Sequence, residues 1–370
     1  MGLGLLILWR AKLRLLFSTA GIAVAVVIIF LEQGFFFGVL DSQSRIAHLI
    51  RGDLVVLHHT RTHLNKWNTL ERINVSQSGA LPAVAAVIPV YKMAMELRNP
   101  DSGRLKRIVT YAFPPDSMPL DLGLSSKAAR ALRLSGTLMF DRRSRDIYGD
   151  IRTGQDLELN GRNYRVGGFV DLGPNVINDG AVVMSEGNLL SLRPSRKPAM
   201  AVLRLQPGAD LEAVRDAITH RLPDLMVMIP AELAAREVRF TATTAPVGII
   251  FGIGMLAGFA IGIIVCYQVL FNEINDLLPQ YATLRAMGFS SAQLGRIVLS
   301  QALLLSLAGF CVALPFVWYL YDGIAARTAL VMELTAGRVL TVLGLTLGMC
   351  LLAGLAAMRR LWRLDPAELY

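Results

Sequence analysis

Three histidines lie close together in the sequence, and imidazole is the side chain that most readily binds metals or moves protons near neutral pH. His59 and His63 are four residues apart, which would place both on one face of a helix. His58 and His59, however, end the run DLVVLHHT, whose composition is typical of a β-strand. The sequence therefore favours exposed loop histidines over a metal site.

Signatures of catalysis are missing from the rest of the sequence. It contains no Walker A pattern for nucleotide phosphates, no H-E-x-x-H zinc motif, no C-x-x-C pair and no G-x-S-x-G nucleophile turn. Its three cysteines, Cys266, Cys311 and Cys350, all lie within apolar runs, so we interpret them as packing residues of membrane helices. We expect no catalytic residue, no metal and no cofactor in this chain.

The most informative stretch is the polar connection NEINDLLPQYATLRAMGFSSAQLGRI. Pro279 can occupy the first position of a short helix, where its missing N–H is no loss, and Gly288 can take the left-handed conformation that ends a helix. Ser290 can then cap the following helix, with Gln293 as its capping-box partner. These signals predict a helix of about two to three turns between two membrane spans.

Tyr281, Leu284 and Met287 recur three residues apart along this short helix and give it one apolar stripe. The sequence offers little in the same chain for the stripe to pack against. The stripe would therefore lie on the membrane surface or dock in a groove of a partner protein, and we favour docking.

A second pattern of small residues marks the apolar run that precedes this connection. Glycine allows helix backbones to approach closely in lipid, where no hydrophobic force drives helices together. The sequence leaves two interpretations open, packing within one subunit and homodimerisation. Glu32, in the outer third of the first apolar run, either lies in water beyond the membrane or lines a cleft. The small-residue positions are Gly248, Gly252, Gly254, Gly258 and Gly262.

The composition of the chain indicates a membrane protein. The 370 residues are 54% hydrophobic and only 18% charged, below the share usual for a soluble domain. Four apolar runs are each long enough to cross a bilayer. The net charge of +9 comes from scattered basic residues, not from a basic stripe, which argues against nucleic-acid binding and leaves membrane lipids as partners.

The runs and their flanking charges predict a membrane protein of four transmembrane α-helices, with a large extracytoplasmic α+β domain inserted between helix 1 and helix 2. Basic residues precede the first run and follow the last, which puts both termini in the cytoplasm. The expected segments are 1–14 (cytoplasmic), 15–40 (helix 1), 41–245 (periplasmic domain), 246–272 (helix 2), 273–296 (cytoplasmic coupling loop), 297–321 (helix 3), 322–338 (short periplasmic loop), 339–358 (helix 4) and 359–370 (cytoplasmic tail).

The domain at 41–245 carries its own signals of a mixed fold. Asn160-Gly161 and the segment 99–103 are typical of hairpin turns. AMAVLRL, DLEAVRDAITHRL and LMVMIP predict a strand, a helix and a strand in succession. Around 125–149 we expect a helix followed by a loop rich in arginine and aspartate. Two subdomains are expected, and there is no sequence repeat that would favour an inverted-repeat transporter.

The motif LPQYATLRAMGFS resembles the cytoplasmic loop of the MacB/FtsX-like (type VII) ABC transporter permeases, and RRLWRLDPAELY resembles their closing tail. Within that family the loop is most similar to the DevC branch, the permeases of heterocyst-glycolipid-type exporters. The resemblance covers the whole layout of helices and outer domain. Where the family has glutamate, this chain has Gln280, which loses the charge interaction with the helix dipole but keeps a hydrogen-bonding group.

The resemblance implies the permease subunit of a tripartite ABC exporter in the bacterial inner membrane, acting by mechanotransmission on a lipid, glycolipid or other envelope molecule. Two copies of a separate P-loop ATPase, a periplasmic adaptor protein, a TolC-like outer-membrane channel and a homodimer of this chain are the implied partners. A lipoprotein-releasing permease and a non-transporting mechanotransmitter that controls an envelope hydrolase are the alternatives. The implied ATPase-coupling residues are Gln280, Tyr281, Leu284, Arg285, Ala286, Met287 and Gly288.

Overall fold

The computed structural model describes residues 12–194, 196–244, 246–328, 330 and 332–362. The described residues divide into two compact units. One, which we call the membrane unit, comprises residues 1–37, 248–324 and 332–370, and the other, the outer unit, comprises residues 38–247 and 325–331. Each unit is described by itself.

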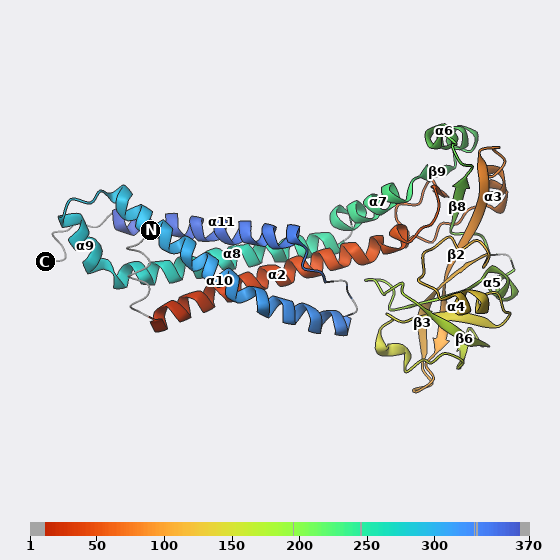
Figure 1. The fold of residues 1–370 in the computed structure, drawn as a ribbon, viewed down its shortest axis with the longest axis horizontal. Helices are drawn as coiled ribbons and strands as arrows, with labels where there is room; N and C mark the ends of the chain where they lie inside the picture. The colour runs from red at the N-terminus through yellow and green to blue at the C-terminus, as the bar shows by residue number, and fades with distance from the viewer. Residues whose placement is uncertain (1–11, 195, 245, 329, 331, 363–370) are drawn as a thin grey trace. The chain divides into compact units, whose positions relative to one another are not determined.

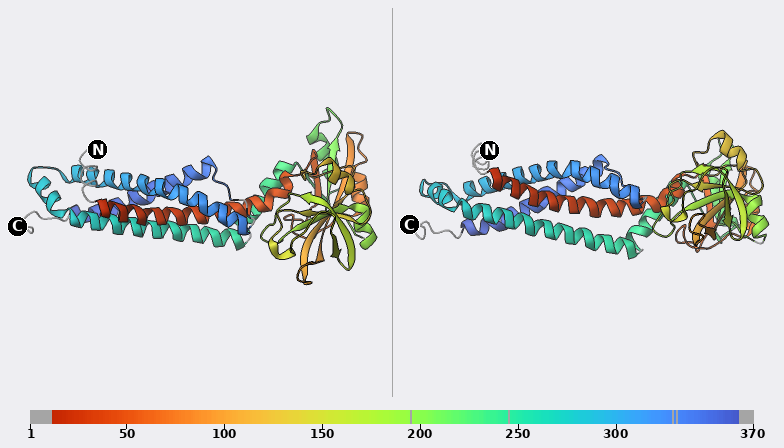
Figure 2. Two further views of the ribbon diagram at one scale, coloured as in Figure 1. Left: turned by 60° about the horizontal axis from the view of Figure 1, so that its bottom comes forward. Right: turned by 90° about the horizontal axis from the view of Figure 1, so that it is seen from below.

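The membrane unit is built of long apolar helices that run side by side (Figures 1 and 2). Within the described ranges, four helices are long and apolar enough to cross a membrane, with candidate spans of 33, 29, 35 and 23 residues. A span needs about 20 residues. This confirms the predicted fold class. The helices are α2 (Lys12–His48), α8 (Pro246–Asp276), α10 (Ser291–Thr328) and α11 (Ala336–Trp362), with the short α9 (Leu278–Ala286) between α8 and α10.

Small and polar residues mark the places where these helices touch. On α10, a methyl group added at Gly309 would lie 2.6 Å from Cγ2 of Ile22 on α2, so this crossing depends on glycine. The Tyr321 hydroxyl donates a hydrogen bond to the Phe30 carbonyl across the same pair of helices. Cys266 on α8 and Cys350 on α11 are buried with their sulfurs 3.3 Å apart, as expected for packing residues.

The outer unit is organised by one mixed sheet. In its described part, nine strands follow the order β3-β7-β4-β6-β5-β2-β8-β1-β9, and an additional β3–β2 pairing closes the first six into a ring. The strands are β1 (Leu54–His58), β2 (Val84–Arg98), β3 (Leu105–Phe113), β4 (Thr137–Asp141), β5 (Asp156–Leu159), β6 (Arg162–Val170), β7 (Ala181–Ser185), β8 (Met200–Leu205) and β9 (Leu225–Met228).

The long strand β2 joins two subdomains. Its first half pairs with β8 from Val84 to Val90, and its second half pairs with β3 from Tyr91 to Arg98. Separate apolar clusters fill the strand ring and the β1–β8–β9 sheet, and a third cluster includes residues from both parts. The helical elements of the outer unit are α3 (Arg72–Ser78), α4 (Ser126–Ala131), η1 (Asp146–Tyr148), α5 (Glu186–Leu192), α6 (Leu211–Arg221) and α7 (Pro230–Thr243).

The local turn signals of this unit are confirmed. Asn160 and Gly161 both have positive φ angles, +51° and +76°, and they connect β5 and β6 as a tight hairpin. The segment 99–103 joins β2 and β3, and the predicted strand, helix and strand are β8, α6 and β9. The sequence missed β4, which lies in the stretch expected to be a loop.

The structure does not place His59 and His63 on a common helix, which was one of the two arrangements that the sequence allowed. His59 and His63 do not share a helix face, because the residues from His59 to His63 form turns and irregular backbone. His58 stacks on His59 with ring centroids 4.8 Å apart, and His63 stacks on Phe240 of α7 at 4.4 Å. Among the described residues, no group of three His, Cys, Asp or Glu side chains is placed to hold a metal ion.

Candidate functional site

The helix α9 is the site that sequence analysis singled out, and its two ends are fixed by local hydrogen bonds. At its C-terminal end Gly288 has φ +94°, and its N–H donates to the Arg285 carbonyl while the Phe289 N–H donates to the Leu284 carbonyl. This pair of bonds is the Schellman motif. Pro279 occupies the second helical position, one residue later than expected, where a missing N–H is equally harmless.

The start of α10 is closed by the capping box that the sequence predicts. The Ser290 N–H donates to Oε1 of Gln293 at 2.8 Å, and the Gln293 N–H donates to Oγ of Ser290 at 3.3 Å. Both bonds are local, so they hold the turn between α9 and α10 without help from distant residues. Helix α9 is thereby joined to α10 by a short, hydrogen-bonded connection (Figure 1).

The apolar stripe of α9 is not one exposed face, and here the expectation was wrong. Tyr281 is only 2% exposed, and its hydroxyl donates a buried hydrogen bond of 3.0 Å to Oε1 of Gln301 on α10. Leu284 is half-buried, whereas Met287 is 63% exposed. The missing signal was the pairing of Tyr281 with a glutamine twenty residues away, which helical spacing alone does not reveal. Tyr281 therefore anchors α9 to its own chain.

The other predicted coupling residues lie on the accessible part of this helix and its end. Gln280, Ala286 and Gly288 are exposed, and Arg285 is half-buried. Phe289, which the sequence reading did not include, is 39% exposed next to Met287. The surface that α9 presents is thus a short patch of polar and apolar side chains centred on Met287.

The glycine face of α8 divides between two environments. A methyl group added at Gly258 would lie 3.4 Å from Ile28 of α2, and one at Gly262 would lie 2.5 Å from the sulfur of Met349 on α11. Gly254 leaves room for the carboxylate of Glu32, 2.6 Å from the position of an added methyl group. Gly248 is buried, whereas an added methyl group at Gly252 would meet nothing within 4 Å.

Most of this glycine series therefore makes contacts inside one chain, where α8 packs on α2 and α11. The carboxylate of Glu32 lies in the interface between α2 and α8 and is half-buried. That location explains why a side chain is excluded at Gly254. Gly252 is the member of the series whose face stays open in the single chain.

A cluster of buried charges in the outer unit was not found from the sequence. Arg61, Lys92 and Glu237 are all buried. Arg61 belongs to loop 59–68, which follows β1, and Lys92 and Glu237 bind this loop from β2 and α7. The Leu64 N–H donates to Oε1 of Glu237 at 2.7 Å, and the Leu64 carbonyl accepts from Nη2 of Arg61 at 2.6 Å and from Nζ of Lys92 at 3.2 Å. Lys92 also donates to Oδ1 of Asn65 at 2.7 Å.

Burial dominates the electrostatics of this cluster. It lowers the pKa of Lys92 to about 7, helped by the positive charge of Arg61. It raises the pKa of Glu237 to about 7, although the Leu64 N–H and the nearby Arg61, Lys92 and Arg236 favour the carboxylate. Burial also lowers the pKa of Arg61 to about 10. Lys92 of β2 and Glu237 of α7, the two groups that hold loop 59–68 from outside, therefore both have a pKa near neutral pH.

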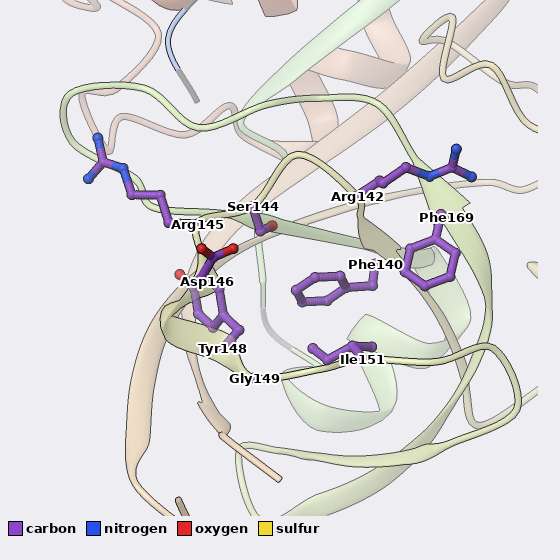
Figure 3. A pocket seen from close by; sticks show the side chains of 9 residues that line it. All are labelled: Phe140, Arg142, Ser144, Arg145, Asp146, Tyr148, Gly149, Ile151 and Phe169. Atoms are coloured by element: carbon purple, nitrogen blue, oxygen red, sulfur yellow. The ribbon is translucent and has the colours of Figure 1, made fainter. Parts of the chain in front are cut away.

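A half-open cleft of about 360 Å³ lies beside η1 (Figure 3). Figure 3 shows Arg142 and Arg145 extending away from each other at two sides of the cleft. The loop that carries them is held by buried Asp141, whose carboxylate accepts N–H groups from Arg143, Leu172 and Gly173. The lining residues are Phe140, Arg142, Ser144, Arg145, Asp146, Tyr148, Gly149, Ile151 and Phe169.

Comparison with protein families assigns both parts of the chain. The model described as MacB-like periplasmic core domain matches residues 15–221, which is more than half of the chain, and the model described as FtsX-like permease C-terminal matches residues 252–366. The chain belongs to the MacB/FtsX family of ABC transporter permeases. It is accordingly a multi-pass membrane protein with an α+β domain of the periplasmic type after its first helix.

Three solved structures are similar to about half of this permease. They are the periplasmic region of MacB from Actinobacillus actinomycetemcomitans (10% identity, 50% of this chain and 92% of that chain, TM-score 0.38) and the extracellular domain of the noncanonic ABC-type transporter YknZ from Gram-positive bacteria (8%, 48% and 98%, 0.33). A domain of a putative permease from Porphyromonas gingivalis is also similar (15%, 49% and 89%, 0.32). No curated protein matches the chain.

The structure describes the two sequence motifs that carry the resemblance to different extents. The loop motif lies on α9 and its C-terminal turn, as described above. The tail motif RRLWRLDPAELY extends into residues 363–370, which lie outside the described residues. The segment 1–11 of the predicted cytoplasmic N-terminus also lies outside them.

Proposed function

We propose that this chain is the permease subunit of a tripartite ABC exporter that works by mechanotransmission. A separate P-loop ATPase, present as two copies beside two copies of the permease, would bind the patch around Met287 and move α9. The observation that carries the proposal is α9 itself: a short helix, capped at its C-terminal end, anchored to α10 by Tyr281 and exposed at Met287. Such a helix transmits displacement because it cannot move independently of α10.

The continuity of the helices supports the relay from α9 to the outer unit. Helix α2 extends from Lys12 to His48, so one helix contains the first residues of the membrane bundle and continues into the first residues of the outer unit. Helix α7 ends at Thr243, and α8 begins at Pro246. In the proposed orientation both termini and α9 are cytoplasmic, the membrane is the bacterial inner membrane, and the outer unit is periplasmic. ATP hydrolysis would take place in the partner, and this chain would supply no catalytic residue.

A charge substitution at the exposed patch tests the coupling. Met287→Asp adds a carboxylate at a side chain that is 63% exposed, so the fold should tolerate it while an apolar docking contact should not. We expect the variant to lose copurification with a P-loop ATPase in mild detergent and to lose stimulation of its ATP hydrolysis. Asn272→Asp, at an exposed residue of α8, adds the same charge outside the patch and is the matched control.

The two variants separate the possible outcomes. If Met287→Asp and the control both retain wild-type ATPase stimulation, the docking patch is assigned to the wrong residues. If the wild-type chain binds no P-loop ATPase at all, the coupling proposal itself fails. Loss of stimulation in both variants would point to general sensitivity to charge at this end of the helices and would also contradict a local docking patch.

The cargo is proposed to be a lipid or glycolipid of the envelope, passed to a periplasmic adaptor and a TolC-like outer-membrane channel. The similarity of the loop motif to the DevC branch supports this choice. A lipidomic comparison of a deletion strain with its parent tests it, because the deletion should strand a specific envelope lipid. Unchanged lipids together with mislocalised lipoproteins would favour lipoprotein release, and unchanged lipids with impaired wall hydrolysis would favour control of a hydrolase.

A further inference from the structure

A tight turn of the outer unit places two apolar side chains at its tip. The Asn175 N–H donates to the Asn178 carbonyl at 2.9 Å, and Oδ1 of Asn175 accepts the N–H groups of Ile177 and Asn178, both at 2.9 Å. Val176 and Ile177 are 43% and 58% exposed at this tip. Turn tips usually carry Gly, Pro, Asn or Asp, and two β-branched apolar residues there contribute nothing to the turn. Their presence indicates contact with something outside the outer unit.

An exposed tryptophan lies in the neighbouring loop. Nδ2 of Asn178 donates to Oδ1 of Asn65 at 3.3 Å, which brings the turn 175–178 against loop 59–68. Trp67, two residues further along that loop, is 46% exposed. The three exposed apolar residues Trp67, Val176 and Ile177 form what we call the apolar tip.

The contact of loop 59–68 with α2 relates the loop to the predicted end of the first membrane span. Nδ2 of Asn65 donates to Oε1 of Gln43 at 2.9 Å. Gln43 follows the predicted end of the first apolar run, residue 40, along one continuous helix, so it lies only about 5 Å further along the helix axis. The polar headgroup layer of a bilayer is about 5–8 Å thick on each side. With the membrane boundary at residue 40, as the sequence predicts, Asn65 would lie at the level of the lipid headgroups.

Basic side chains surround the apolar tip. The guanidinium of Arg107 lies 5.8 Å from the centre of the Trp67 ring, and Lys66 is its sequence neighbour. Arg145 forms an ion pair with Asp179, immediately after the turn. Arg143 lies beside Gly173, with Nε 3.8 Å from the position of an added methyl group there. Tryptophan with flanking Lys and Arg is the composition that proteins use at the interface of a bilayer.

We propose that the apolar tip is a membrane-contact surface: Trp67, Val176 and Ile177 insert between the phospholipid headgroups of the leaflet next to the outer unit, and the basic side chains around them contact the lipid phosphates. The occupant is the bilayer that holds the helices of this same chain. The surface would give the outer unit direct access to lipid at the foot of α2. It does not depend on the ATPase or the cargo proposed above, so each proposal can fail separately.

Collision measurements on a spin label test this surface in the full chain. A nitroxide is attached at Ile177→Cys in a Cys311→Ser background, because Cys311 is the exposed native thiol within the described residues. The protein is reconstituted in nanodiscs of phosphatidylethanolamine and phosphatidylglycerol. Leu134→Cys, at an apolar outer-unit residue that is 61% exposed, is the matched control. We expect a several-fold higher ratio of oxygen to nickel-chelate collisions at 177 than at 134.

Each outcome decides the proposal. Equal ratios at the two sites would place the apolar tip in water and overturn it. Low collision rates with both reagents at 177 would show that a second copy or another protein covers the tip and would overturn it as well. Val176→Cys should repeat the result from the neighbouring residue. In nanodiscs of phosphatidylcholine alone the ratio at 177 should fall, and an unchanged ratio would contradict the contact between the basic side chains and anionic lipid.

Discussion

The hydrogen bond between Glu237 and the Leu64 N–H offers a quantitative test of how loop 59–68 is held. The bond is 2.7 Å long and buried, and it joins the loop to α7. Glu237→Ala removes the acceptor and leaves a buried N–H without a partner, which costs about 1–3 kcal/mol. Opening of the loop should therefore become about 5- to 150-fold more frequent, since each 1.4 kcal/mol is a factor of ten.

Hydrogen exchange with mass spectrometry measures this opening directly in the full chain in nanodiscs. The peptide covering loop 59–68 should exchange faster in Glu237→Ala, while a peptide from α6 should not change. Glu237→Gln is the matched control, measured below pH 7. There the wild-type carboxyl group is mostly protonated, because its pKa is raised to about 7, and the amide oxygen of glutamine can still accept the Leu64 N–H. The glutamine variant should therefore stay close to wild type.

Two results would refute this reasoning. Unchanged exchange of loop 59–68 in Glu237→Ala would mean that the loop is held by Arg61 and Lys92 alone. Equal acceleration in the alanine and glutamine variants would mean that the geometry of the carboxyl group, and not the presence of an acceptor, determines the stability of the loop.

Three further predictions follow from the same contacts. Burial raises the pKa of Glu237 from 4.5 to about 7 and lowers that of Lys92 from 10.5 to about 7. The folded state thus binds more protons than the unfolded state below pH 7 and fewer above it. The local stability of loop 59–68 should therefore be lowest near pH 7 and rise on both sides. Hydrogen exchange corrected for the intrinsic rates at each pH measures this stability, and a profile that only rises or only falls would contradict the prediction. Gly309→Ala places a methyl group 2.6 Å from Ile22 and should lower the free energy of unfolding of the detergent-solubilised chain by about 1–3 kcal/mol. Gly323→Ala, on the same helix, places a methyl group with nothing within 4 Å and should leave this free energy unchanged. Tyr281→Phe, which loses the buried bond to Gln301, should weaken the attachment of α9 by about 1 kcal/mol and accelerate exchange in that helix, and unchanged exchange would show that packing alone holds it.

Features that depend on neighbours in the sequence could be predicted well. The positive φ of Gly288 and the capping box of Ser290 and Gln293 are set by residues within one turn, so their sequence signals carry the whole interaction. The Asn160–Gly161 hairpin is similar, because its conformation follows from the two residues themselves. The four apolar spans are predictable for another reason, since the bilayer fixes their length.

Features that depend on distant residues could not be predicted in the same way. Arg61, Lys92 and Glu237 come from a loop, a strand and a helix that are far apart in the sequence, and charged residues are seldom buried, so nothing local identifies them as a cluster. The burial of Tyr281 likewise depends on a residue that is distant in the sequence. A stripe at spacing three describes which side chains share a helix face, but only the position of Gln301 decides which face turns inward.

The loop that the buried cluster holds contacts the two helices that connect the outer unit to the membrane spans. Two adjacent residues of loop 59–68 bind two different helices: Asn65 donates to Gln43 of α2, and Leu64 donates to Glu237 of α7. Helix α2 contains the first span, and α7 precedes α8, which contains the second. A displacement of either helix relative to the other must therefore strain this loop or break its hydrogen bonds. If motion of the membrane helices reaches the outer unit through α2 and α7, as proposed, the loop that both helices bind is the element whose opening should report that motion first.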